Sequence, residues 1–395
     1  MSTVNKRNAI LLASLVVIAG VFQFLTRDAQ NPFLSARSIS TVFTQASVIG
    51  VLACGMTFII ILTHIDLSVG SALAFLGGIA AWMMAPPAHT DGPGAPNAAL
   101  GLMDAVPSGP GFHPAVVLVL IPLVGILLWA AKGLLQSYTG MPAFIITLGG
   151  MMGYRGLSYL IVKREIPIAY DGLISRIGTD FLDVRLGWAV LAAVGVYAAV
   201  SSFTALHRGG RVRPASLAAP ALLAGVVVFL QMKHPGVNED ARGISYLTCI
   251  WAATALAMSY VADNTVYGRH LYATGGNFEA ARLCGIRVRR VNIAAFACMG
   301  LVVSIASLMY LGQQGTAESS AGQLAELDAI AACVIGGVSL RGGKGSIAGA
   351  ALGAIIMQSL TSGLYQCNVE SGYQMVVKAV VLVGVIAIDH AVRRD

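Results

Sequence analysis

Side chains that could do chemistry are rare in this sequence, and three carboxylates stand out because apolar runs surround them. Asp66 is followed by Ser68 between two such runs, and Glu326 and Asp328 precede a third. An ionisable side chain in apolar surroundings is costly to keep, so it indicates a path or gate for a polar ligand. The alternatives are structural: helix capping or a structural hydrogen bond for Asp66, and capping or loop solvation for Glu326 and Asp328.

The other patterns that could carry catalysis, metal binding or nucleotide binding fail on spacing or context. Histidines are isolated, and the six cysteines form no CxxC pair. The glycines of 343–348 fit a dinucleotide fingerprint, but that fingerprint requires a βαβ unit around it. The run 337–345 fails the phosphate-loop pattern, because Val338 stands where its first glycine is required and Gly345 where Ser or Thr is required. We expect no catalytic residue and no metal or cofactor bound by this chain.

A polar island over 272–285 interrupts the apolar sequence. Asn277 is a good N-cap, because its side-chain oxygen can accept a free N–H of the first helical turn. Glu279 and Arg282 follow where their charges suit the helix dipole, and Gly285 lies where a left-handed C-terminal glycine belongs. The sequence predicts a capped helix of about seven residues, too short to be stable alone.

This short helix has two interpretations. It is either an ordinary amphipathic loop helix or a helix that docks against a soluble partner. The docking interpretation is favoured because Ala280 and Ala281 would leave a low-profile surface between Glu279 and Arg282. Gly275 and Gly276 before the helix would allow a sharp turn out of the bilayer.

The composition places these features in a membrane protein. The 395 residues are 56% hydrophobic and 11% charged, whereas soluble domains average about 25% charged residues. Charge-free stretches such as those from Lys132 to Arg155 and from Arg290 to Glu318 exceed the roughly 20 residues that cross a bilayer as a helix. We expect a single all-α domain over 1–395, a polytopic bundle with about 10–12 transmembrane helices.

The candidate spans differ in strength. The segment near 324–345 carries Glu326, Asp328 and Gly336-Gly337, so we expect it to be broken or re-entrant. The pair of spans in 187–231 is a possible two-helix insertion. The spans are predicted at 8–26, 40–63, 67–86, 114–135, 143–162, 187–205, 215–231, 244–262, 291–312, 324–340, 346–364 and 372–390.

The loop charges predict the orientation. Lys and Arg concentrate on one side, with Lys132 assigned to a loop on that side, and the positive-inside rule makes it the cytoplasm. Both termini and segment 263–290 would then be cytoplasmic, and the Pro- and Gly-rich loop 86–114 would lie outside. The net charge of +7 is spread over short loops, so we expect membrane lipid and no nucleic acid as a partner.

Glycines at four-residue spacing mark two helix faces. Gly345, Gly349 and Gly353 share one face, and Gly149 and Gly153 share another. In lipid, glycine lets helix backbones approach closely. Each face is either an intramolecular packing surface or a subunit interface.

Four ordered motifs resemble one family. The island 272–287 resembles the cytoplasmic loop of permease subunits of ABC sugar importers of the ribose and xylose type. Ile65-Asp-Leu-Ser-Val-Gly-Ser71 and Ala143-Phe-Ile-Ile-Thr-Leu-Gly149 resemble two further motifs of that family, and the block 326–346 resembles a fourth. The resemblance covers about 40–364, and the chain's length and extra hairpin are more similar to the xylose type. Arg341 and Lys344 depart from the usual pattern by adding charge to the glycine block.

The resemblance implies the permease subunit of an importer that moves a monosaccharide, xylose or another pentose, into a bacterial cytoplasm across the inner membrane. It implies a second permease copy, a periplasmic sugar-binding protein and a separate ATPase subunit that binds ATP and magnesium. The residues expected to couple to the ATPase are Gly275, Gly276, Asn277, Glu279, Ala280, Ala281, Arg282 and Gly285. The candidates for the translocation path or gate are Asp66, Ser68, Thr147, Glu326 and Asp328.

Two other classes of protein stay open. An ion-coupled secondary sugar transporter would also fit many spans, but it would need carboxylates or broken helices that bind the coupling ion. An integral membrane enzyme would need a catalytic constellation in a pocket, and no cluster of His, Asp or Glu in the sequence supplies one.

Overall fold

The computed structural model describes residues 3–29, 31–86, 109–182 and 244–392, together with 185, 187–189 and 192. The expected outer loop 86–114 and hairpin 187–231 fall almost wholly outside these residues, so both stay predictions. The chain divides into two compact units, which are described separately: unit 1 is 1–46, 180–249 and 355–395, and unit 2 is 47–179 and 250–354.

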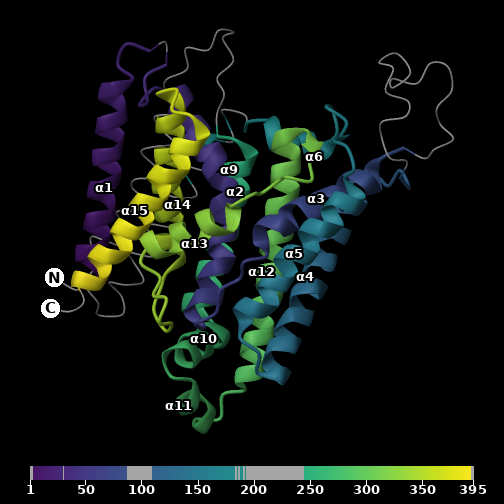
Figure 1. The fold of residues 1–395 in the computed structure, drawn as a ribbon, viewed down its shortest axis with the longest axis vertical. Helices are drawn as coiled ribbons and strands as arrows, with labels where there is room; N and C mark the ends of the chain where they lie inside the picture. The colour runs from purple at the N-terminus through teal and green to yellow at the C-terminus, as the bar shows by residue number, and fades with distance from the viewer. Residues whose placement is uncertain are drawn as a thin grey trace. The chain divides into compact units, whose positions relative to one another are not determined.

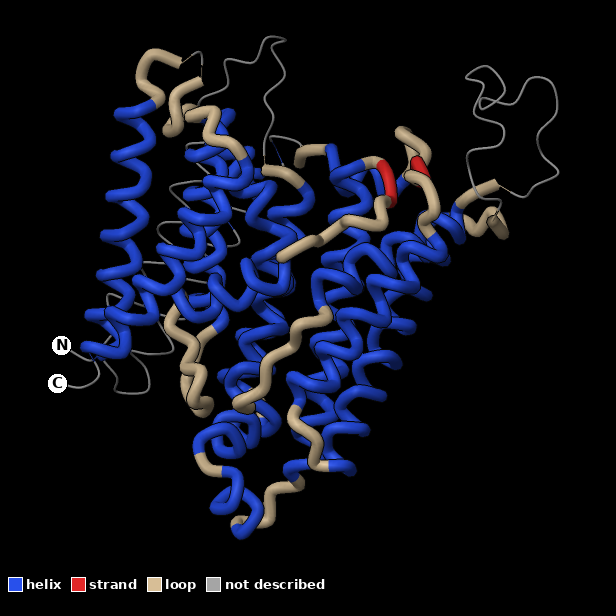
Figure 2. Tube along the Cα trace, in the orientation of Figure 1, coloured by secondary structure: helices blue, strands red, loops and turns tan. Residues whose placement is uncertain are grey.

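The described residues are almost entirely helical, as Figures 1 and 2 show. Only two short strands occur among them, β1 (Ile166–Pro167) and β2 (Thr316–Ala317), which pair antiparallel. This confirms the all-α prediction. The helices are α1 (Thr3–Leu25), α2 (Ala36–Ile61), α3 (Val69–Met84), α4 (Pro114–Thr139), α5 (Ala143–Ile161), α6 (Leu173–Thr179), α9 (Tyr246–Asn264), α10 (Val266–Gly276), α11 (Phe278–Leu283), α12 (Val288–Gln314), α13 (Ala325–Ile335), α14 (Ile347–Gln366) and α15 (Ser371–Val392).

Several helices have the length and composition of membrane spans. Among the described residues, α2, α4, α12 and α14 are long and apolar enough to cross, and Leu11–Leu25 and Val69–Met84 form shorter apolar helices. The prediction of a broken segment near 324–345 is confirmed. Helix α13 has 11 residues, or about 16 Å of helix, which is well short of a hydrocarbon core of about 30 Å.

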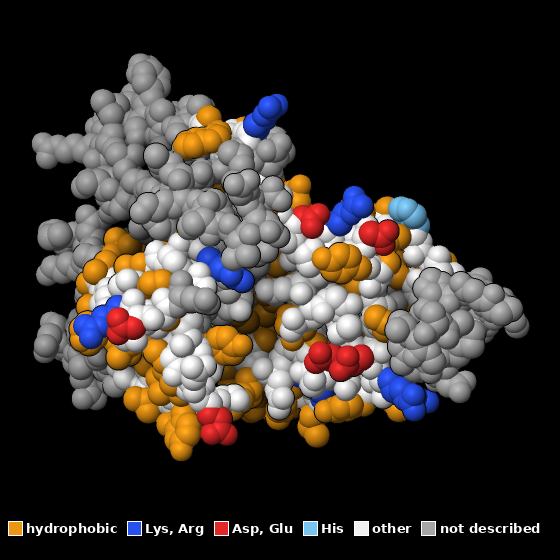
Figure 3. Space-filling view, turned by 90° about the horizontal axis from the view of Figure 1, so that it is seen from above, with side chains coloured by type: hydrophobic (Ala, Val, Ile, Leu, Met, Phe, Trp, Pro, Cys, Tyr) orange, Lys and Arg blue, Asp and Glu red, His pale blue; other side chains and the backbone are white. Residues whose placement is uncertain are grey.

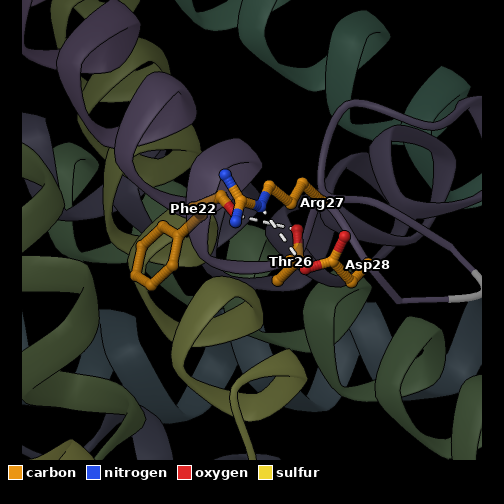
Figure 4. Close-up of polar contacts among 4 residues, drawn as sticks. All are labelled: Phe22, Thr26, Arg27 and Asp28. Carbon is orange, nitrogen blue, oxygen red and sulfur yellow. Dashed lines mark hydrogen bonds and ion pairs between the residues drawn. The ribbon is translucent and has the colours of Figure 1, made fainter.

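Unit 1 is held by aromatic packing and local caps. The Thr26 hydroxyl donates to the Phe22 carbonyl (2.7 Å) at the end of α1, and Arg27 pairs with Asp28 (Figure 4). Thr26 also accepts from the N–H of Phe33 (2.8 Å). The Phe22 and Phe33 rings lie 5.4 Å apart. They form a small core with Val42 and Leu360.

Unit 2 contains the candidate functional residues. Within it α4, α5 and α12 run side by side, and α11 lies below their lower ends in Figure 1, connected through α10. Helices α4 and α12 touch backbone to backbone, because a Cβ added at Gly125 would lie 2.6 Å from the Gly300 carbonyl oxygen. Such close approach through small residues is how helices associate in lipid.

The two glycine faces differ in their surroundings. Gly349 lies against Gly336, and Gly353 lies against Ala332. The intramolecular interpretation is therefore confirmed for the 345–353 face. Nothing lies within 4 Å of a Cβ added at Gly149 or Gly153, so within this chain that face of α5 has no packing partner among the described residues.

The face at the top of Figure 1 shows no single charged surface. In Figure 3, the described acidic and basic side chains form small separate groups among apolar ones.

Candidate functional site

The α10–α11 segment consists of two short consecutive helices, each with a side-chain N-cap. Thr265 caps α10 by accepting from the N–H of Gly268 (3.1 Å). Asn277 ends α10 and caps α11, because its side-chain oxygen accepts from the N–H of Ala280 (2.9 Å). The predicted N-cap is confirmed. Helix α11 is six residues long, one fewer than the sequence predicts.

The C-terminal end of α11 also follows the sequence pattern. Gly285 has φ +81, the left-handed conformation expected of a glycine that ends a helix. The next residue, Ile286, donates its N–H to the Ala281 carbonyl (3.1 Å). Glu279 and Arg282 form an exposed pair at 3.1 Å. Exposed pairs of this kind contribute only about 0–1 kcal/mol to folding stability. The two charges are therefore more important for the surface of α11 than for its stability.

The surface of α11 is more apolar than its sequence suggests. Phe278 is 51% exposed and Leu283 is 83% exposed. The prediction that Ala280 and Ala281 together form the outer surface is wrong for Ala281, which is 4% exposed. Because α11 packs on α12, one alanine faces inward and the two large apolar side chains face out. The surface of α11 therefore combines two exposed apolar side chains with the charges of Glu279 and Arg282.

A second set of polar residues is buried inside unit 2. The Asp66 carboxylate accepts from the Ser68 hydroxyl (2.6 Å) and from the Trp129 indole N–H (2.5 Å). Lys132 donates to the Ser68 hydroxyl oxygen (2.5 Å). Asp66, Ser68 and Trp129 have no exposed surface, and Lys132 is 7% exposed. We call Asp66, Ser68, Trp129 and Lys132 the polar cluster.

Aromatic rings close this cluster on one side. The Lys132 ammonium lies 3.4 Å from the Trp129 ring centre and 4.7 Å from the Tyr154 ring centre. Tyr154 stacks on both Trp129 and Phe75, with ring centres 5.7 and 5.4 Å apart. Cation–π contacts strengthen when the cation is desolvated, and here they surround a cation that lies among helices.

The assignment of Lys132 to a cytoplasmic loop is wrong. It lies within α4 with its side chain buried. Its charge is accommodated by Ser68 and the nearby Asp66, more than sixty positions earlier in the chain. A loop-charge rule counts Lys and Arg by position, so it cannot detect a partner so distant in sequence.

Thr147 and Glu326 lie next to the polar cluster. Thr147 is buried and donates to the carbonyl of Ile65 (3.1 Å), in the chain segment that carries Asp66. The Glu326 carboxylate lies against Gly70, two residues after Ser68. Glu326 is 8% exposed, and its Oε2 has no hydrogen-bond partner among the described residues. Loop solvation is thus wrong for Glu326.

Asp328 is placed differently from the other path candidates. It is half-buried in the first turn of α13, where a negative charge suits the helix dipole. The N-cap of α13 is Leu324, in a left-handed conformation and without a side-chain capping bond. The capping interpretation of Glu326 and Asp328 stays a prediction, and the structure brings Asp66, Ser68, Thr147 and Glu326 together around the start of α3.

Comparison with known proteins gives a consistent picture. The family model described as branched-chain amino acid transport system, permease component, matches residues 38–386. The chain is 34% identical to the xylose transport system permease protein of Escherichia coli (strain K12), over 100% of this chain and 94% of that protein. It is 32% identical to the xylose permease of Haemophilus influenzae, over 98% and 97%. It is 31% identical to the ribose import permease of Escherichia coli (strain K12), over 96% and 92%. No solved structure matches the chain.

Proposed function

This chain belongs to the family of branched-chain-amino-acid-type transport permease components, and from that premise we propose that it is the membrane subunit of an ATP-driven monosaccharide importer. The family is one of transport subunits and not of enzymes, and the chain is a polytopic helical membrane protein. Full-length similarity to permeases for xylose and ribose supports a pentose as the substrate. Xylose is the first sugar to test, because the xylose permease is the more similar of these two relatives.

The observation that carries the ATP-driven mechanism is the exposed surface of α11. A helix of six residues is unstable alone, yet this one is capped at both ends and presents Phe278 and Leu283 to its surroundings. We propose that a separate ATPase subunit, which binds ATP and magnesium, docks there. The coupling residues in this proposal are Gly275, Gly276, Asn277, Glu279, Ala280, Ala281, Arg282 and Gly285. Gly275 is buried against Ile61 and Gly343, so it supports the docking surface from inside and does not touch the ATPase subunit.

The rest of the assembly follows from the same proposal. A periplasmic sugar-binding protein delivers the sugar on the opposite side, and a second copy of the permease completes the path. Both termini lie in the cytoplasm in this proposal. The open face of α5 around Gly149 and Gly153 supports contact with lipid or with the second copy.

We place the sugar path next to the start of α3. Asp66, Ser68, Thr147 and Glu326 gather there, and Asp328 follows on α13. Oε2 of Glu326 is buried and has no hydrogen-bond partner in the described part of the chain, so it is an acceptor available to a sugar hydroxyl. The chain supplies this path and the lever at α11, and no covalent chemistry.

Co-purification tests the docking proposal. The tagged chain is isolated in detergent from native membranes, and bound ATPase activity is measured for the wild type and for Glu279→Ala/Arg282→Ala. We expect the wild type to retain an ATPase that the double variant loses. The matched control is Arg164→Ala/Glu165→Ala, which removes an exposed pair of opposite charges from the β1 side of unit 2 and should retain the ATPase.

The competing function is an ion-coupled secondary transporter. A chain that purifies alone, without ATPase activity, and that takes up sugar only on an ion gradient would establish this alternative. The broken segment around α13 is the feature that such a transporter would share.

A further inference from the structure

The α10–α11 segment and the polar cluster are joined by direct contacts between backbones. The N–H of Gly343 donates to the carbonyl of Ile61 (2.9 Å), the last residue of α2. Gly275, near the end of α10, fits against the same carbonyl: a Cβ added there would overlap the Ile61 oxygen and lie 2.9 Å from the Gly343 nitrogen. Three segments far apart in sequence therefore meet at one carbonyl oxygen.

The third segment is the tight turn over 339–345. Ser339 donates its N–H to the Lys344 carbonyl, and Gly342 donates to the Ser339 carbonyl, both at 2.9 Å. Gly342 and Gly343 have φ of +79 and +69, which other L-residues rarely adopt. A Cβ at Gly342 would lie 2.6 Å from the Gly275 carbonyl oxygen. The side chains of Arg341 and Lys344 are exposed, so their charges do not disturb this packing.

A side-chain hydrogen bond reinforces the contact. The Tyr272 hydroxyl on α10 donates to the Gly345 carbonyl oxygen (3.0 Å). Burial, with a smaller contribution from Asp263, raises the pKa of Tyr272 to about 12, so the hydroxyl keeps its proton at physiological pH. The turn is thus linked to α10 by both backbone packing and a hydrogen bond.

On the other side, Ile61 leads directly to the polar cluster. Helix α2 ends there, Thr63 has φ 63, and the chain runs without helical structure through 64–68 into α3. This short segment carries Asp66 and Ser68, which bind Trp129 and Lys132 of α4. Ile61 and Asp66 are only five residues apart in the chain. A displacement of Ile61 would therefore reach Asp66 through this short segment.

We propose that Ile61, Gly275, Gly342 and Gly343 form a junction that transmits movement of α11 to the segment 62–68, and that the three glycines are positioning residues for transport. Contacts between backbones cannot absorb a displacement by a change of rotamer, so a shift of α10 must move Ile61 or separate from it. The inference rests on the proposed function only in that an ATPase subunit moves α11.

The test compares three single alanine variants in the complete importer, with its ATPase and binding protein, in proteoliposomes. Gly275→Ala inserts a methyl group into the junction. Gly178→Ala is the crowding control, because its Cβ would overlap Gly312 where α6 packs on α12. Gly156→Ala is the open control, because nothing lies within 4 Å of its Cβ. The readouts are retention of the ATPase subunit, ATP hydrolysis, and sugar transported per ATP.

We expect Gly275→Ala to retain the ATPase subunit and hydrolyse ATP while sugar transported per ATP falls roughly tenfold, within the usual range of coupling between sites. Both controls should keep the wild-type ratio in the protein that assembles. A wild-type ratio in Gly275→Ala, or an equal loss in Gly178→Ala, would overturn the junction. If the wild type retains no ATPase, the proposed function fails and not the junction.

A milder variant keeps the proposal testable if Gly275→Ala does not assemble. Tyr272→Phe removes only the hydroxyl that binds Gly345, so it leaves the fold of α10 intact. We expect sugar transported per ATP to fall about threefold with this variant, in line with loss of one hydrogen bond. An unchanged ratio in Tyr272→Phe would contradict the junction.

Discussion

The contacts of the α11 segment and those of the polar cluster differ in sequence separation and in exposure to solvent. The contacts of α11 join residues three apart, as in Asn277 to Ala280 and Glu279 to Arg282, and they are exposed. The contacts of the polar cluster join Asp66 to Trp129 and Ser68 to Lys132, and they are buried. Exposed pairs contribute about 0–1 kcal/mol, whereas removing one partner of a buried charge pair costs about 3–5 kcal/mol. Changes in α11 should therefore alter binding, and changes in the cluster should alter stability.

The largest effect is expected at Asp66. Asp66→Ala leaves the Ser68 hydroxyl and the Trp129 N–H without their acceptor and removes the nearby negative charge from the buried Lys132 ammonium, and should lower the free energy of unfolding by about 3–5 kcal/mol. Thermal unfolding of the purified chain in detergent measures this loss. Adding Lys132→Met should recover much of it, since the unpaired charge is then gone. If Asp66→Ala is as stable as the wild type, Asp66 has no structural role.

The next effect concerns the apolar surface of α11. Leu283→Ser should weaken retention of the ATPase subunit by about 2 kcal/mol, because burying an exposed leucine side chain in an interface contributes about 1.5–3 kcal/mol. The stability of the chain alone should change by no more than about 0.5 kcal/mol. Leu256→Ser is the control, because Leu256 is an exposed leucine of α9. Equal retention in Leu283→Ser and Leu256→Ser would remove α11 from the docking surface.

The smallest effect is expected at the cap between α10 and α11. Asn277→Ala removes the acceptor of the Ala280 N–H and should cost about 1 kcal/mol, while Asn277→Asp keeps an acceptor and should restore the helix. Hydrogen exchange of the 278–283 amides measures the change. Protection that is equal in Asn277→Ala and the wild type would mean that the flanking helices, and not the cap, hold α11.

The same comparison explains what the sequence could predict. Asn277 as a cap and Gly285 as a left-handed terminus follow from local rules and are confirmed. The break at α13 follows from Gly336-Gly337, which lies just after the helix ends. The sequence-based predictions for Lys132 and for the outward face of Ala281 are wrong, because the segment before α3 and helix α12, and not neighbouring residues, determine their surroundings.

The missed residues leave weak signals in the sequence. Trp129 and Lys132 lie three apart in α4, one helical turn, so they share a face. A cation and an indole on one face of an apolar helix indicate a buried partner. The sequence near Trp129 and Lys132 does not identify Asp66 as that partner, because Asp66 is 63 positions away from Trp129. The roles assigned to the coupling and path residues stay predictions until function is measured.

The most direct test of the central claim is xylose uptake into proteoliposomes that contain this chain, its ATPase subunit and its binding protein. ATP is supplied on the α11 side, and uptake is measured with and without an ionophore that collapses ion gradients. The account predicts uptake that requires ATP and is unaffected by the ionophore. Uptake without ATP, abolished by the ionophore, would contradict it and identify a secondary transporter.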